Sequence, residues 1–188
     1  DGRMRIDSAA SNDDDVGAIT TGILAWTAGD GDLWMEARLF LSSITDNKFC
    51  VGFGDTIASS DETFFDATTD TVDILTMSDG IAVFFDNDAT TKNLWAAAAK
   101  TDAITFSESL PARLNPVAAT AITLGVFLSA DRKQARFYVN GEEVSRKVSD
   151  TTLVAAVDLV PGVWTYEQGT ACNYDIDYID ATKDRSTS

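Results

Sequence analysis

Alternation of apolar and polar residues runs through much of this chain, and it is clearest between residues 33 and 43. Leu33, Met35 and Leu39 fall on one side of this segment, whereas Trp34 and Glu36 fall on the other. A period of two is typical of a β-strand with one buried face and one face toward water. We therefore predict a strand here, with its polar face exposed.

The segment from Asp131 to Val148 predicts a central β-hairpin. Residues 135–139 alternate, and Asn140-Gly141 then separates them from residues 142–144. Asn-Gly favours a two-residue type I′ turn, which needs positive φ at both central positions. A slip of one residue would bury Arg136, so we expect this cost to fix the register of the pair.

Similar patterns, separated by turn residues, predict about ten strands in all. The other expected strands are 18–27, 47–54, 72–77, 80–86, 93–100, 121–130, 161–167 and 171–181, with 153–160 as a further strand or a turn of helix. Asp79-Gly80 predicts a hairpin between 72–77 and 80–86. In the last strand, strict alternation places Tyr174, Ile176 and Tyr178 on one face, and Asp175, Asp177 and Ile179 on the other.

Short strands at spacings of about 8 to 15 residues, with almost no helical segment to cross between them, predict an all-β, antiparallel β-sandwich. We expect one domain over residues 18–182, with a polar arm at 1–17 and a polar tail at 183–188. The connection 55–70 carries Phe64 and Phe65 and should fold back as a lid over a sheet edge. Residues 101–120 contain Pro111 and Pro116 and form the longest connection predicted to be irregular.

The composition of the chain argues against several classes of function. The net charge of −16 would repel a phosphate backbone, which argues against direct nucleic-acid binding. The sequence contains no run of about 18 apolar residues, so it predicts no membrane span. The chain has no histidine, which removes histidine-based nucleophilic machinery and the usual zinc ligands. Cys50 and Cys172 are expected to be free buried thiols, with a disulfide between neighbouring strands as the alternative.

The residues from Ser129 to Val144, with the run Phe-Tyr-Val-Asn-Gly inside them, resemble the strand and hairpin of concanavalin A-like or laminin G-like jelly rolls. The segment from Leu159 to Ile179 is similar to the close of such domains in bacteriophage virion proteins. The resemblance covers about a third of the chain and implies a concanavalin A-like sandwich. This fold hosts lectins, glycosidases, lyases and capsid parts, so it does not by itself specify a function.

A glycosidase on this fold needs two facing carboxylates. Trp34, Glu36 and Arg38 lie on such a strand, but the second glutamate is missing. Asp175 and Asp177 are expected to form a solvated acidic face. We therefore predict that the chain is not an enzyme and has no catalytic residues, cofactor or metal site.

The favoured interpretation is a capsid decoration, or cement, protein on the outer surface of a virion. The major capsid protein or another virion subunit would be its partner, and we expect a homo-oligomer, with a trimer favoured. Phe64, Phe65, Pro111 and Pro116 are the predicted partner contacts.

The alternative is a lectin-like module for glycan attachment, such as a tail or head fibre domain. Its predicted contacts are Trp34, and the cluster of Asp86, Asp88 and Trp95. An aromatic platform beside acidic turns would suit a sugar, with or without calcium.

Overall fold

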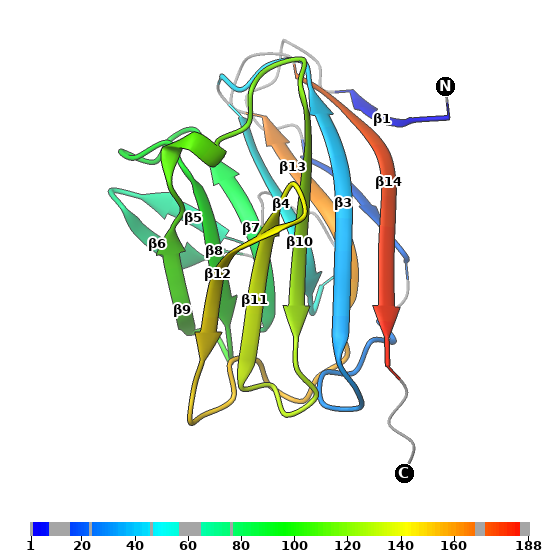
Figure 1. The fold of residues 1–188 in the computed structure, drawn as a ribbon, viewed down its shortest axis with the longest axis vertical. Coiled ribbons are helices and arrows are strands. Elements are labelled where there is room, and N and C mark those ends of the chain that lie inside the picture. The colour runs from blue at the N-terminus through cyan, green and yellow to red at the C-terminus, as the bar shows by residue number, and fades with distance from the viewer. Residues whose placement is uncertain are drawn as a thin grey trace.

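The computed structural model describes residues 2–7, 16–22, 24–45, 47–56, 65–75, 77–167 and 172–184. Within these residues the regular secondary structure is almost all antiparallel β-strand, arranged mainly as two stacked six-stranded sheets (Figure 1). The front sheet has the order β1 (Met4–Asp7), β14 (Asn173–Lys183), β3 (Leu33–Leu41), β10 (Ala121–Leu128), β11 (Gln134–Val139) and β12 (Glu142–Val148). The predicted all-β sandwich is confirmed.

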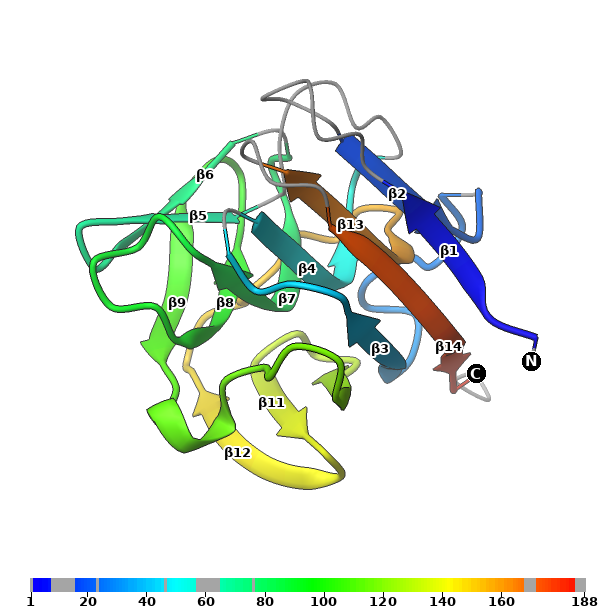
Figure 2. The same cartoon turned by 90° about the horizontal axis from the view of Figure 1, so that it is seen from above.

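The back sheet lies behind it and has the order β2 (Val16–Thr20), β13 (Val160–Glu167), β4 (Asn47–Gly54), β7 (Gly80–Asp86), β8 (Leu94–Ala99) and β9 (Ile104–Ser109). The view from above shows the two layers and the small hairpin of β5 (Phe65–Thr68) and β6 (Thr71–Ile74) on the outer side of the back sheet (Figure 2). One short 3₁₀ helix, Ala112–Leu114, follows β9.

The main core fills the space between the sheets. Met35, Leu39 and Phe137 of the front sheet and Phe49 and Phe53 of the back sheet are all fully buried in it. Each fully buried side chain of this size contributes roughly 1.5–3 kcal/mol by leaving water, so this layer is the main source of stability.

The predicted central hairpin is confirmed. Asn140 and Gly141 have φ of 52° and 81°, and Val139 pairs with Glu142 on either side of the turn. Both central residues are therefore in the left-handed region, as a type I′ turn requires.

Two local predictions are wrong. The segment 72–77 does not pair with 80–86, because β6 pairs with β5 instead and leaves β7 between β4 and β8. Residues 101–120 are not irregular throughout, since 104–109 form the edge strand β9. Residues 4–7 of the predicted arm form β1, which pairs with β14.

A β-bulge at Asp177 changes which side chains of β14 face water. Ile176 pairs with Leu39, but the next pair is Tyr178 with Arg38, so one residue is left over. The bulge moves Tyr178 to the exposed face and Ile179 to the core side, against the predicted alternation. Because β1 covers only Asn173 to Ile176, the rest of β14 lies at the sheet edge among the described strands.

Cys50 and Cys172 are both buried thiols that form no disulfide, as the first of the two alternatives predicted. Cys50 lies in β4 on the outer side of the back sheet, whereas Cys172 belongs to the core between the sheets. The back sheet itself separates the two thiols, which explains why they do not form a bridge.

Candidate functional site

The outer face of the front sheet is the open face of the sandwich. Along β3, side chains alternate between fully buried and half-buried, so Trp34, Glu36, Arg38 and Phe40 all point outward. The strand register extends this face across the sheet. It places Asp180, Glu36, Gly125, Tyr138 and Glu143 side by side in one row.

A hollow of about 380 Å³ lies on this face, and we call it the groove. The side chains of Glu36, Arg38 and Tyr178 border it on one side, and small residues of β10 form its floor. Its lining is completed by Ala121, Thr123, Asn140 and Gly141. Most of these groups are polar, so the groove is suited to a ligand rich in hydroxyl groups.

The hairpin turn closes one end of the groove. The Asn140 amide donates to the Thr123 carbonyl at 2.7 Å, and the Thr123 amide donates to Asn140 Oδ1 at 3.0 Å. These two bonds hold the turn against β10, so the groove wall is fixed by backbone as well as by side chains.

Glu36 is the carboxylate at the centre of the face. The Tyr178 hydroxyl donates to Glu36 Oε1 at 2.5 Å, and this bond raises the pKa of Tyr178. Asp180 is exposed and is the direct cross-strand partner of Glu36. Directly opposed side chains have Cβ atoms about 5 Å apart, so two carboxylates lie together where the sequence appeared to offer only one.

An aromatic shelf lies beside this pair. The rings of Trp34 and Tyr138 meet edge to face, with centroids 4.8 Å apart. Gly125 lies between the two rings and, having no side chain, keeps the surface between them low. A Cβ at this position would be 3.4 Å from Trp34 Cη2 and 3.5 Å from Tyr138 Cβ. Aromatic faces next to a few polar groups are typical of small-ligand sites.

Of the predicted glycan contacts, only Trp34 lies on this face. Trp95 is 5% exposed and stacks on Phe84, with ring centroids 6.5 Å apart, beneath the β5–β6 hairpin. Asp86 is fully buried. The predicted cluster of Asp86, Asp88 and Trp95 is therefore not a surface platform, and that prediction is wrong.

Asp86 instead belongs to a buried charge cluster centred on Lys48. The Lys48 ammonium forms an ion pair with Asp66 and lies 3.4 Å from Asp86 and 4.0 Å from the exposed Asp88. Asp86 also accepts backbone hydrogen bonds from Ala67 at 2.9 Å and from Asp88 at 2.8 Å. Lys48 comes from β4, Asp66 from β5 and Asp86 from β7, so the cluster fastens the small hairpin to the back sheet.

Burial and the neighbouring charged groups act against one another in setting the pKa values of this cluster. Loss of water raises the pKa of Asp86 to about 6, and the hydrogen bond that it shares with Asp66 acts in the same direction. Burial also opposes ionisation of Asp66, but its hydrogen bonds with Asp86 and Lys48 outweigh this and lower its pKa. For Lys48, burial is likewise outweighed by its acidic neighbours, and its pKa is raised.

The predicted partner contacts do not form one surface. Phe65 is fully buried and stacks on Phe84, with ring centroids 5.5 Å apart, because β5 and β6 fold over the back sheet. Pro116 is also buried, whereas Pro111 is exposed. Phe64 lies outside the described residues. Phe65 and Pro116 are therefore unavailable to a partner as the chain is folded.

Within the described residues, no helix is long and apolar enough to cross a bilayer. Among the same residues, no group of three or more Cys, Asp or Glu side chains has an arrangement that could hold a metal ion.

Neither a family model nor a curated protein matches the sequence. Solved structures do match. One, titled for endo-acting O-glycanases of the human gut microbiota that initiate mucin breakdown, has a TM-score of 0.66 at 11% identity and covers 97% of this chain and 80% of its own. A Bacillus licheniformis β-glucanase has a TM-score of 0.60 at 12% identity, with 97% and 79% covered. The Emp46p carbohydrate recognition domain, in its potassium-bound form, has a TM-score of 0.60 at 8% identity, with 89% and 78% covered.

These likenesses show the fold, and the concanavalin A-like jelly roll is confirmed by carbohydrate-recognition domains and glucanases alike. They lend no support to the predicted capsid role, and the trimer and the virion partner stay predictions.

The prediction that the chain is not an enzyme is wrong. A β-glucanase, a glycosidic hydrolase and a lichenase from a mouse hindgut metagenome are among the neighbours. Glycoside hydrolysis generally needs paired carboxylates rather than histidine, so the lack of histidine does not argue against it. The structure also supplies the second carboxylate, Asp180, that the sequence pattern of β3 lacked.

Proposed function

We propose that the chain binds a carbohydrate on the outer face of the front sheet, along the groove and the aromatic shelf. The observation that carries this proposal is the single row in which Asp180, Glu36 and Tyr138 lie side by side, with Gly125 keeping the floor open. Charged groups hydrogen-bond strongly to hydroxyls, and an aromatic ring can pack against the apolar face of a sugar. The carbohydrate-binding and carbohydrate-cleaving neighbours support the same class of ligand.

The test is binding of the whole chain to a panel of neutral and acidic polysaccharides, measured by affinity electrophoresis and titration calorimetry. Trp34→Ala removes the shelf, and Glu36→Gln removes the central charge while keeping the shape. Each should weaken binding about tenfold or more, which corresponds to roughly 1.4 kcal/mol.

Asp150→Asn is the matched control for the charge change. Asp150 is exposed and follows β12, at the end of the β11–β12 hairpin opposite the groove. Binding should be unchanged in this variant. Binding to no polysaccharide, or equal binding by all four proteins, would contradict the proposal.

Glycoside hydrolysis is a second candidate, and the pairing of Glu36 with Asp180 favours it. Retaining glycosidases hold their two carboxyl groups about 5–5.5 Å apart. Opposed strand residues have Cβ atoms about 5 Å apart, so the side chains of Glu36 and Asp180 can bring their carboxyl groups to such a separation. Release of reducing ends from a bound polymer should then fall by about a hundredfold or more in Asp180→Asn, since this variant loses a reacting group. Binding without release of reducing ends would contradict hydrolysis and leave carbohydrate binding as the only proposed function.

A further inference from the structure

The outer face of the front sheet gathers arginines. The whole chain has a net charge of −16, yet five of the seven arginines among the described residues lie on this face, on β1, β3, β11 and β12 and just before β1. They are Arg3, Arg5, Arg38, Arg136 and Arg146. These arginines offset the carboxylates of the same face, so this surface is much less negative than the rest of the molecule. The carboxylates are Glu36, Glu143, Asp175, Asp177 and Asp180.

Two of these arginines meet over one ring. The guanidinium carbon of Arg3 lies 3.8 Å from the centre of the Phe40 ring, and that of Arg38 lies 5.5 Å from it. Each contact is a cation–π attraction, but the two like charges repel one another. An anion placed between or beside them would relieve this repulsion.

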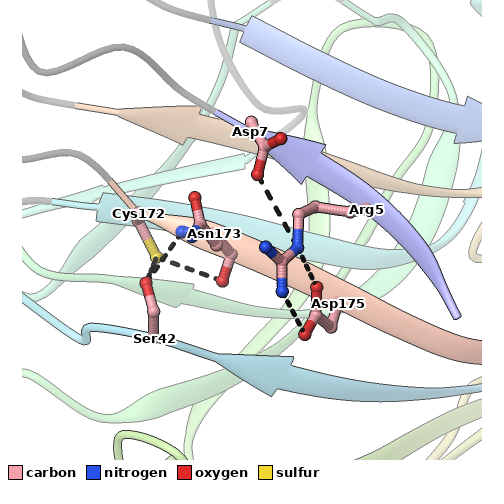
Figure 3. A network of polar contacts seen from close by, with 6 residues as sticks. All are labelled: Arg5, Asp7, Ser42, Cys172, Asn173 and Asp175. Atoms are coloured by element: carbon pink, nitrogen blue, oxygen red, sulfur yellow. Dashed lines mark hydrogen bonds and ion pairs between the residues drawn. The ribbon is translucent and has the colours of Figure 1, made fainter. Parts of the chain in front are cut away.

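The neighbouring carboxylates are already engaged. Arg38 pairs with Asp177 at 3.2 Å. Arg5 pairs with Asp175 at 2.5 Å and lies 3.7 Å from Asp7 (Figure 3). Arg3, by contrast, forms no ion-pair contact with a carboxylate in the described part of the chain, although its charge helps to lower the pKa of Asp175. Its guanidinium donors are available to a ligand.

Arg3 borders a second hollow, of about 250 Å³, which we call the arginine hollow. Arg5, Phe40, Ser42, Asn173 and the carboxylate Asp175 also line it. Asp175 is paired with the Arg5 guanidinium, and Figure 3 shows this pair with Asn173 and Ser42 nearby. It adjoins the groove, because Phe40 is the cross-strand partner of Ala121, which lines the groove. Successive side chains on one face of a strand are about 7 Å apart, so a short oligosaccharide could reach both hollows.

We propose that the carbohydrate bound on this face is acidic, and that the arginine hollow receives a carboxylate or sulfate group of one sugar unit while its neighbours lie in the groove. Arg3 lines the hollow and is the principal contact. Arg38, which lines the adjoining groove and faces the same Phe40 ring, is the second. A guanidinium presents planar, paired N–H donors that match the oxygens of either group. This proposal rests on the proposed function, which it deepens by naming the class of sugar.

The net negative charge of the chain does not prevent such contacts. Charges on other faces are screened over about 8–10 Å at physiological salt, whereas groups in direct contact are screened much less. Binding should therefore depend mainly on the local arginines. It should also weaken as salt is raised.

The experiment compares three polymers of similar size on the whole chain: polygalacturonate for carboxylates, dextran sulfate for sulfates, and a neutral β-glucan. Dissociation constants are measured at 50 and 250 mM salt for the wild type, Arg3→Gln, Arg3→Lys and Arg113→Gln. Arg113 is an exposed arginine on the 3₁₀ helix and serves as the matched control.

We expect an acidic polymer to bind more tightly than the neutral one. Arg3→Gln should weaken acidic binding about tenfold to a hundredfold, as loss of a hydrogen bond to a charged group does. The affinity of Arg3→Lys for the acidic polymer should lie between those of the wild type and Arg3→Gln, because lysine keeps the charge but lacks the paired donors. Neutral binding should change less than about twofold, and Arg113→Gln should have no effect.

Preference for the neutral polymer, or acidic binding that Arg3→Gln leaves intact, would overturn the acidic assignment while the proposed function stands. Binding of no polymer in the panel would overturn both. Preference between polygalacturonate and dextran sulfate decides which anionic group the hollow accepts. Unchanged melting of each variant confirms that the fold is retained, as expected for an exposed residue before β1.

Discussion

The two sheets of this sandwich share a common inner core but differ completely on their outer faces. The front sheet exposes a mixed surface of carboxylates, arginines and aromatic rings, and β3 alternates strictly between buried and half-buried positions. The back sheet is buried on both faces over β4, β7 and β8. Its outer face has an apolar cluster of its own, under the β5–β6 hairpin.

This difference separates stability from recognition. Polar groups on the back sheet are shielded and need partners, so Lys48, Asp66 and Asp86 satisfy one another. Polar groups on the front sheet can exchange protein contacts for ligand contacts. Substitutions on the two faces should therefore affect different measurements.

The largest expected effect is on the back sheet. Lys48→Met would leave Asp66 and Asp86 buried without their cation, and removing one partner of a buried ion pair costs about 3–5 kcal/mol. Urea unfolding at pH 7 should show a loss of this size. Lys92→Met, at an exposed position, is the control and should change stability by less than about 0.5 kcal/mol. Equal stability of the two variants would mean that the cluster does not fasten the hairpin.

The pH dependence of stability sharpens the same contrast. Asp86 titrates near 6 when folded and near its ordinary value of 3.8 when unfolded. Between these values the folded chain binds more protons, so this group's contribution to the free energy of unfolding falls as pH rises. Asp66 acts in the opposite sense and below this range, because its folded pKa is lowered.

We therefore expect Asp86→Asn to gain stability relative to the wild type as pH rises from about 4 to 6.5. The measurement is the free energy of unfolding of both proteins at several pH values in this window. Asp150→Asn, which changes an exposed carboxylate, should run parallel to the wild type. Parallel curves for Asp86→Asn as well would show that Asp86 does not titrate there.

The smallest effect on stability is expected on the front sheet. Gly125→Ala places a methyl group 3.3 Å from the Met35 carbonyl and 3.4 Å from the Trp34 ring, so the ring must give way slightly. The free energy of unfolding should change by less than about 1 kcal/mol, but carbohydrate binding should fall several-fold because the surface between Trp34 and Tyr138 of the aromatic shelf rises. A large loss of stability with unchanged binding would reverse the distinction between the two sheets.

Local signals in the sequence predicted much of the fold. Asn140-Gly141 specified its turn because the backbone conformation that it needs is nearly unique to such residues. The alternation along β3 correctly predicted that Glu36 and Trp34 face water. Both are properties of a few neighbouring residues.

The site itself depended on strand register, which no short segment encodes. Asp180 lies beside Glu36 only because β14 pairs with β3 and carries a bulge at Asp177. Likewise, Phe65 is buried because β5 and β6 cover the back sheet, and the turn at Asp79-Gly80 joins strands that pair elsewhere. The one available signal was the surplus polar residue in the Asp175-Ile176-Asp177-Tyr178 run, which strict alternation cannot accommodate without exposing Ile179.

The bulge at Asp177 also affects whether two molecules can associate along the edge of the front sheet. Beyond Ile176, β14 has no neighbouring strand among the described ones, and a straight ribbon there would invite a second molecule to add to the sheet and begin a fibre. The kink at Asp177 breaks the regular spacing of amide and carbonyl groups, and Asp180 and Lys183 leave charges along the margin. The bulge and these charges therefore oppose association of two molecules along this edge of the front sheet.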